Sequence, residues 1–323
     1  MILTVSLLLL GFAVLIKGAD FLVSGASSIA KKMGISTLAI GLTVVAFGTS
    51  TPELIVSLLS AIDGKSDASF GNIIGSNNFN LLFILGISGM IYPLVVQRNT
   101  IRYEIPISIV AVIVLYLLVN DVLLWQAKTN QLTRVDSFIL LVFFLIFMLY
   151  IYRTMKLESE YEETPVKIYT TFVSVLLTII GLIMLVAGGK LVVNNAVELA
   201  RHFGLSEKII GLTILAAGTS LPELATSAVA AYKKNTDIAI GNVVGSNIFN
   251  IFFILGVTGM VRPMQFNAAM NFDMYVLGLS SFILMIFMFT LNMRKLDRWE
   301  SFILLIGYIV YVIFLIGMEP GTV

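Results

Sequence analysis

Apolar stretches of about 20 residues, separated by short polar segments, follow one another along the whole chain. A helix of about 20 apolar residues spans a lipid bilayer, so this pattern predicts an all-α integral membrane protein. The first stretch, residues 1–16, has the character of a signal peptide, but no basic segment precedes it, and we interpret it as a retained helix. Ten transmembrane helices are expected, over residues 1–30, 36–61, 69–92, 104–125, 134–153, 168–202, 207–231, 239–261, 272–293 and 299–317.

The order of the polar positions repeats within the chain. Residues 11–93 align with residues 181–263 without a gap, at a constant offset of 170 residues. Five predicted helices separate each position from its counterpart, and an odd number reverses the direction across the bilayer. We therefore expect two inverted five-helix repeats, residues 1–153 and 168–323, joined by a linker at 154–167. Inverted repeats with broken helices are a recurring plan of secondary transporters.

Composition narrows the function classes. The chain is 58% hydrophobic and 12% charged, whereas soluble domains carry about 25% charged residues. The net charge of +1 favours no nucleic-acid partner, and the absence of cysteine excludes disulfides and thiolate metal sites. No nucleotide-binding or zinc-protease motif is present. We expect no enzyme activity and no cofactor, with the lipid bilayer as surroundings and no obligatory protein partner.

Two copies of one motif carry the chemistry. "GTSTPE" ends at Glu53 and "GTSLPE" ends at Glu223. Pro52 and Pro222 lack a backbone N–H, so we expect helices 2 and 7 to break there, near the middle of the membrane. Broken backbone at this depth is tolerated only where it lines a cavity. The oxygens expected to face that cavity are the carbonyls of Ala46, Thr49, Ala216 and Thr219 and the hydroxyls of Thr49, Ser50, Thr219 and Ser220.

The two glutamates indicate a cation. A carboxylate deep in a bilayer is costly unless it is paired, protonated or bound to an ion. Inverted symmetry brings Glu53 and Glu223 together, and a divalent cation would relieve their repulsion. All candidate ligands are oxygens, which Ca2+ and Na+ prefer. The single histidine, His202, is expected at the surface, so zinc and copper are not favoured.

A second repeated element reads "GNIIGSNNFN" and "GNVVGSNIFN". Within each copy, serine and asparagine four residues apart share a helical face, so we expect Ser76, Asn80, Ser246 and Asn250 to face the glutamates. For Asn72, Asn77, Asn242 and Asn247 we expect interhelical hydrogen bonds. The glycines Gly71, Gly75, Gly241 and Gly245 permit close helix packing. Lys17, Asp20 and Lys190 are expected to reach the membrane interface, with no role in transport.

At these motifs the chain resembles the cation/Ca2+ exchanger superfamily, and it is most similar to the prokaryotic sodium/calcium exchangers. The resemblance implies ten helices, with helices 1 and 6 sliding as a gate. It implies Ca2+ ligation by Thr49, Glu53, Thr219 and Glu223. It implies Na+ sites at Ala46, Thr49, Ser50, Glu53, Ser76, Ala216, Thr219, Ser220, Glu223 and Ser246, with Asn80 bordering the centre. Asn250 stands where archaeal and potassium-dependent relatives carry aspartate, which disfavours potassium coupling.

The leading hypothesis is therefore a Na+/Ca2+ antiporter. An H+/Ca2+ exchanger using the same glutamates and a Ca2+ channel remain alternatives, and the sequence does not separate Ca2+ from Mn2+. Two carboxylates balance one Ca2+ or two Na+. A third Na+, for which the flanking serines offer oxygens, would carry one excess charge, so we expect electrogenic exchange of three Na+ for one Ca2+. Twelve lysines and arginines lie on one side and six on the other, which predicts a cytoplasmic Lys156–Lys167 loop and external termini in the cell membrane.

Overall fold

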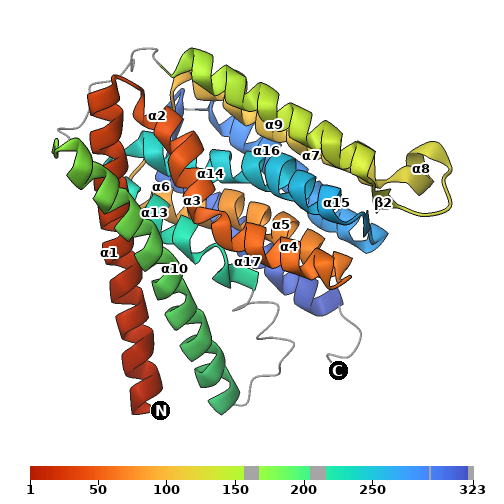
Figure 1. The fold of residues 1–323 in the computed structure, drawn as a ribbon, viewed down its shortest axis with the longest axis horizontal. Coiled ribbons are helices and arrows are strands. Elements are labelled where there is room, and N and C mark those ends of the chain that lie inside the picture. Colours follow the sequence, from red (N-terminus) through yellow and green to blue (C-terminus); the bar gives the residue numbers. More distant parts are fainter. Residues whose placement is uncertain (156–166, 204–215, 291, 319–323) are drawn as a thin grey trace.

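The computed structural model describes residues 1–155, 167–203, 216–290 and 292–318. Helices dominate it (Figure 1). The α-helices are α1 (Ile2–Met33), α2 (Thr37–Ile40), α3 (Ala46–Thr49), α4 (Thr51–Ile62), α5 (Ser66–Asn78), α6 (Leu85–Ile91), α7 (Ile105–Val119), α8 (Asp121–Trp125), α9 (Arg134–Thr154), α10 (Thr171–His202), α12 (Ala216–Gly218), α13 (Leu221–Tyr232), α14 (Thr236–Ile248), α15 (Gly256–Val261), α16 (Asn271–Phe287) and α17 (Arg298–Met318).

Wider π-helical turns join several of these helices into longer spans. They cover Gly41–Val45, Phe79–Ile84, Thr100–Glu104 and Phe249–Leu255, and one 3-10 turn covers Ala268–Met270. In the described part of the chain, eight continuous helices are long and apolar enough to cross a membrane, and the bent pair 37–49 and 51–62 makes a ninth. The predicted multi-pass membrane protein is confirmed. The predicted helix over 207–231 lies partly outside the described residues.

Two predicted helices end earlier than their apolar runs. The helix expected over 104–125 stops at Val119, because Asn120 leaves helical geometry at φ −103° and ψ 50° and its side-chain amide donates to the Tyr116 carbonyl at 3.0 Å. The helix expected over 272–293 stops at Phe287, and the chain then turns through Arg294, with φ of 63°, into a strand. Local polar contacts therefore override hydropathy at both ends.

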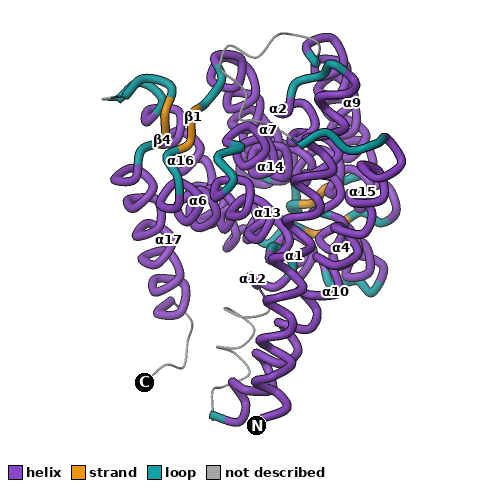
Figure 2. The backbone as a smooth tube through the Cα atoms, turned by 90° about the vertical axis from the view of Figure 1, so that its left-hand side faces the viewer, coloured by secondary structure: helices purple, strands orange, loops and turns teal. Residues whose placement is uncertain are grey.

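Four short strands join the two halves of the chain at opposite ends of the molecule. β1 (Leu94–Val95) pairs antiparallel with β4 (Lys295–Leu296), and β2 (Gln131–Leu132) pairs antiparallel with β3 (Met264–Gln265). Figure 2 shows β1 and β4 side by side near the top of the molecule. We call these ends the β1/β4 end and the β2/β3 end.

The two repeated segments form the centre of the bundle. The span Ser66–Ile91 is 78% buried and Thr236–Val261 is 94% buried, whereas the other continuous spans are between 22% and 39% buried. Protein therefore surrounds these two spans, and the remaining helices face the lipid with their apolar sides. The central position explains how their many serine and asparagine residues are accommodated, because each polar group there can find a partner inside the protein.

Helices α1 and α10 form a closely packed pair that projects beyond the bundle (Figure 1). Glycines let the two backbones approach each other: a methyl group built on Gly181 would lie 2.6 Å from the Leu22 nitrogen and 2.8 Å from the Gly18 carbonyl. The hydroxyls of Ser28 and Ser174 are 2.8 Å apart across the same interface. These contacts indicate that α1 and α10 behave as one unit.

Candidate ion-binding site

The GTSTPE and GTSLPE motifs break their helices where the sequence predicts. Ser50 separates α3 from α4 with φ −81° and ψ 6°, and the two segments meet at 46°. Ser220 adopts nearly the same conformation, φ −90° and ψ 8°, immediately before α13. In each case proline occupies the second position of the new helix, where its missing N–H costs little. The glutamate follows it in the first turn of that helix.

The expectation of a freed carbonyl at Ala46 was wrong. This carbonyl accepts the Ser50 N–H at 3.0 Å and the Thr49 hydroxyl at 3.3 Å. Proline removes the donor to the carbonyl four residues before it, so the group that loses its partner belongs to Gly48. A cation at the Ala46 carbonyl would have to displace the Thr49 hydroxyl.

The two carboxylates are buried, and each is held by the opposite half of the chain. Glu53 and Glu223 are both 0% exposed. The Ser220 hydroxyl donates to Glu53 Oε1 at 3.0 Å, and the Ser50 hydroxyl donates to Glu223 Oε1 at 2.9 Å. Ser76 adds a longer bond to Glu53 Oε1 at 3.5 Å. The carboxylates are close enough to repel each other, and among the described residues no basic side chain pairs with either.

Buried oxygens without hydrogen-bond donors mark the place for a cation. Oε2 of both glutamates and Oδ1 of Asn80 and Asn250 are buried and accept no hydrogen bond from any described residue. Asn80 lies one helical turn beyond Ser76, which contacts Glu53, so its amide belongs to the same centre. Leaving such an oxygen unsatisfied costs about 1–3 kcal/mol, and more when it is charged. A bound cation would satisfy all four oxygens together.

Two further asparagines determine which end of each central amide is free. The amide nitrogen of Asn77 donates to the Asn247 main-chain carbonyl at 3.2 Å, which leaves Asn77 Oδ1 to accept the amide nitrogen of Asn250 at 2.8 Å. The Asn250 nitrogen is thereby occupied, and its oxygen is the unpartnered end. Asn247 and Asn80 repeat the arrangement at 3.3 Å and 3.0 Å. The predicted interhelical bonds of Asn77 and Asn247 are confirmed. The sequence did not predict that these two residues also accept the amide nitrogens of Asn250 and Asn80.

Asn72 and Asn242 support the motifs in the same symmetric way. Asn72 donates to the Glu53 carbonyl at 3.2 Å and accepts the Thr219 hydroxyl at 3.2 Å. Asn242 donates to the Glu223 carbonyl at 3.3 Å and accepts the Thr49 hydroxyl at 3.0 Å. The Thr219 hydroxyl gives its proton to Asn72, and the Thr49 hydroxyl shares its proton between Asn242 and the Ala46 carbonyl, so the oxygen lone pairs of both threonines remain available to a cation. Their spacing from the glutamates, 19 residues in both halves, was a signal that sequence reasoning could have used.

The remaining predicted positions fall where their residue types suggest. Ser246 is buried, and its hydroxyl faces Glu223. His202 is exposed, as predicted. A methyl group built on Gly241 would lie 3.0 Å from the Leu38 carbonyl and one on Gly245 would lie 2.9 Å from Leu42 Cα, whereas one on Gly71 or Gly75 would meet no described residue within 4 Å. Within those residues no cluster of three or more His, Cys, Asp or Glu side chains forms a metal site, so the centre has two carboxylates rather than three.

A cavity borders this centre, because Asn72 and Thr219 are among its lining residues. It measures about 410 Å³ and lies between α4 and α10, where it is lined by Thr51, Val56, Asn72, Lys190, Asn194 and Thr219. α4 continues from the cavity to Ile62, whose carbonyl is bonded by Arg262 beside β3, so the cavity lies toward the β2/β3 end. Thr219 and Asn72 are partly exposed there, whereas their counterparts Thr49 and Asn242 are buried.

Comparison with known proteins identifies the family. A family model described as sodium/calcium exchanger protein matches residues 3–153 and 173–317. The putative antiporter CaxA of Alkalimonas amylolytica is 38% identical over 320 residues, covering 96% of this chain and 98% of the relative. The sodium/calcium exchanger MaX1 of Methanosarcina acetivorans is 30% identical, covering 96% of this chain and 97% of the relative.

A solved structure agrees with these relatives. The sodium-calcium exchanger NCX_Mj, soaked with 10 mM Na+ and 10 mM Sr2+, superposes with a TM-score of 0.82 at 32% identity, covering 97% of this chain and 98% of that chain. The prediction of a transporter rather than an enzyme is confirmed. From its matched halves and its whole-length likeness to these exchangers, the chain belongs to the sodium/calcium exchanger family.

Proposed function

We propose that this protein is a secondary active antiporter that exchanges Na+ for Ca2+ across the cell membrane by alternating access. The observation that carries the proposal is the set of four buried oxygens, from Glu53, Glu223, Asn80 and Asn250, to which no described residue donates a hydrogen bond. A cation coordinated by these oxygens would satisfy them and balance the charge of the two carboxylates. The family of the chain and the names of its relatives agree with this choice.

The scaffold for this function is proposed to be ten helices in two inverted repeats of five. The repeats are residues 1–153 and 168–323, and the linker at 154–167 is proposed to be cytoplasmic, with both termini outside. The two strand pairs support the inversion, because Leu94 of β1 and Met264 of β3 are 170 residues apart and lie at opposite ends of the molecule.

Ca2+ is proposed to bind between Glu53 and Glu223, with the hydroxyls of Thr49 and Thr219 completing its oxygen shell. Two carboxylates neutralise its charge and are released from their mutual repulsion. The hydrogen bonds that Thr49 donates to Asn242 and Thr219 donates to Asn72 hold the threonines beside the carboxylates of the opposite motif. Ca2+ accepts six to eight oxygens in flexible geometry, so water from the cavity can fill the remaining positions.

Na+ is proposed to use the same centre and its flanks. The proposed ligands beyond the Ca2+ set are Ala46, Ser50, Ser76, Ala216, Ser220 and Ser246. Ser50 and Ser220 already bridge the two halves through their bonds to the glutamates, so replacing Ca2+ by several Na+ would redistribute these hydroxyls. With Asn80 and Asn250 neutral, two Na+ balance the carboxylates and a third leaves one excess positive charge. Exchange of three Na+ for one Ca2+ is therefore proposed to be electrogenic.

The direct test is ion flux in proteoliposomes that contain the purified protein. Radioactive Ca2+ uptake is measured with an imposed outward gradient of Na+, K+ or H+, one at a time. The proposal expects uptake with the Na+ gradient alone. Uptake driven by H+ without Na+ would establish the H+/Ca2+ alternative, and uptake without any counter-gradient, together with single-channel currents, would establish a channel.

A further inference from the structure

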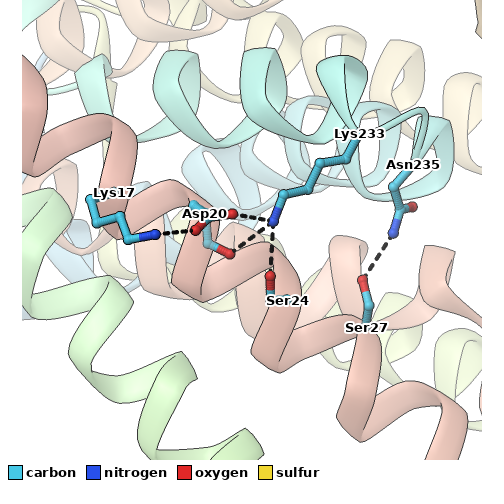
Figure 3. A network of polar contacts seen from close by, with 6 residues as sticks. All are labelled: Lys17, Asp20, Ser24, Ser27, Lys233 and Asn235. Carbon is cyan, nitrogen blue, oxygen red and sulfur yellow. Dashed lines mark hydrogen bonds and ion pairs between the residues drawn. The ribbon is translucent and has the colours of Figure 1, made fainter. Parts of the chain in front are cut away.

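The structure contains an ion pair between the α1–α10 unit and the bundle that the site does not use. Asp20 on α1 was expected to reach the interface, but instead it pairs with Lys233, which follows α13 (Figure 3). Lys233 also donates to the Ser24 hydroxyl at 2.8 Å and to the Asp20 main-chain carbonyl at 3.2 Å. Asp20 retains a bond with Lys17 of its own helix at 2.8 Å.

The contact lies toward the end of the molecule away from the cavity between α4 and α10. Lys233 follows the C-terminus of α13, and close by in the chain Asp237 accepts a bond from Gln97, which follows β1. The Asp20–Lys233 contact therefore fastens α1 to the bundle toward the β1/β4 end. Neither side chain is fully exposed, at 33% and 31% of its area. The cavity toward the other end is open at the same time.

The internal repeat places a second set of charges at the open end, with the signs exchanged. The offset of 170 residues relates Asp20 to Lys190, Ser24 to Asn194 and Lys233 to Asp63. In the contact that is formed, Lys233 on the bundle donates to two acceptors on α1, Asp20 and Ser24. In the second set, Asp63 on the bundle is an acceptor, and Lys190 and Asn194 on α10 are both donors. The chemistry is complementary in both cases.

The second set is not engaged in this structure. Lys190 and Asn194 are exposed and line the cavity. Among the described residues Lys190 forms no ion pair, and Asp63 lies 3.5 Å from Lys65 of its own loop, with both side chains largely exposed. The Asp20–Lys233 contact is thus formed at the end away from the cavity, and the contact of Lys190 and Asn194 with Asp63 is not formed at the end where the cavity lies.

We propose that Asp20–Lys233 and Lys190–Asp63 are alternating latches that position the α1–α10 unit at the two ends of the transport cycle. When the unit moves to close the cavity, Lys190 and Asn194 meet Asp63, and Asp20 leaves Lys233. Each pair stabilises one conformation and is absent from the other. This inference rests on the proposed alternating access, but it concerns which residues hold each conformation and not which ions move.

Accessibility of a single cysteine tests the latches without any ion flux. The chain has no cysteine of its own. Val56→Cys places one thiol on the cavity wall, at a position that is 39% exposed, where a membrane-impermeant maleimide reports the open state. Asp20→Asn or Lys233→Gln should slow labelling, because the conformation seen here loses its latch. Lys190→Gln or Asp63→Asn should accelerate labelling, because the opposite conformation loses its latch.

The expected changes are roughly threefold to tenfold, as partly exposed ion pairs stabilise a state only modestly. Lys128→Gln is the control, because it removes the charge of an exposed lysine that belongs to neither latch. The double variant Asp63→Lys/Lys190→Asp should restore the original labelling rate.

The latches are supported if variants of the Asp20–Lys233 pair slow the labelling of Val56→Cys and variants of the Lys190–Asp63 pair accelerate it. A change of the labelling rate in the same direction for both pairs would overturn the latches, even if Na+-driven Ca2+ uptake were intact. An unchanged rate in Lys190→Gln and Asp63→Asn would overturn them as well. Conversely, failure of Na+ to drive uptake would refute the proposed antiport but leave opposite labelling shifts standing. A cysteine pair, Asp63→Cys with Lys190→Cys, gives a second measurement: oxidation should cross-link it and arrest labelling of the cavity wall, and absence of a cross-link would contradict the closed contact.

Discussion

At the scale of residues, the centre is organised by asparagines that do not themselves offer a free oxygen. Asn77 uses both ends of its amide, donating to the Asn247 carbonyl and accepting from Asn250. A main-chain carbonyl can only accept, so this bond fixes the orientation of the whole chain of amides. Residues that orient the ligands of a metal ion are often almost as important as the ligands.

Asn77→Leu should therefore weaken Ca2+ binding although Asn77 is not a proposed ligand. The apolar side chain keeps the volume, but it releases the Asn250 amide, whose oxygen then no longer points reliably into the centre. The concentration of Ca2+ that gives half-maximal exchange should rise by about 10- to 100-fold. Asn78→Leu is the control. The side-chain amide of Asn78, the next residue along the chain, donates to the Asp273 carbonyl at 3.0 Å, away from the site. Equal effects of the two variants would remove the positioning role.

The sequence predicted the glutamates, threonines and serines of the site because proline and glutamate recur in both halves. It predicted interhelical bonds for Asn72 and Asn77, but not their partners. The partners of Asn77, and the Thr219 hydroxyl that donates to Asn72, come from the opposite repeat, across separations of 147 to 173 residues. No local pattern carries such information, since it depends on how closely the two halves approach.

At the scale of elements, the breaks and the glycine contacts decide the architecture. Pro52 and Pro222 begin new helices at the places that the motifs predict. The glycines of α1 and α10 recur at intervals of seven residues, at 11, 18 and 25 and at 181 and 188, which places them on one face of each helix. Hydropathy alone shows two long apolar helices, and their close contact became evident only in the fold.

Gly181→Ala tests this contact. Its methyl group would meet backbone atoms of Leu22 and Gly18, which cannot move aside as a side chain can. We expect a loss of about 1–3 kcal/mol in the free energy of unfolding, measured as a lower thermal midpoint in detergent. Gly278→Ala on α16, where the nearest atom is 3.8 Å away, should leave the midpoint unchanged or raise it slightly. A stable Gly181→Ala variant would contradict the close packing.

At the scale of the whole molecule, the two copies of the repeated motif lie in different surroundings. Thr49 and Asn242 are sealed, while Thr219 and Asn72 border the cavity. The sequence could not predict which end is open, because both motifs read almost alike. The difference arises from the position of the α1–α10 unit, which packs α1 against α13 and separates α10 from α4.

The charge of the whole cycle leads to a prediction about membrane potential. Three Na+ for one Ca2+ moves one charge, and 100 mV then contributes about 2.3 kcal/mol. This energy changes the equilibrium Ca2+ ratio roughly fiftyfold. The measurement is Na+-driven Ca2+ accumulation in vesicles whose potential is set by valinomycin and K+. An accumulation ratio that does not respond to the potential would indicate two Na+ per Ca2+ instead.

The binding of Ca2+ between Glu53 and Glu223 is tested most directly by Na+-driven Ca2+ uptake in the variants Glu53→Gln and Glu223→Gln. Glutamine keeps the shape of glutamate and can still accept from Ser220 or Ser50, so the fold should be retained, as judged by an unchanged thermal midpoint. Removing one of the two charges leaves Ca2+ unbalanced between the halves. We expect uptake at the background level in both variants, in vesicles of the same kind as those in which the unaltered protein transports Ca2+. Substantial uptake by either folded variant would contradict a binding site built on the paired carboxylates.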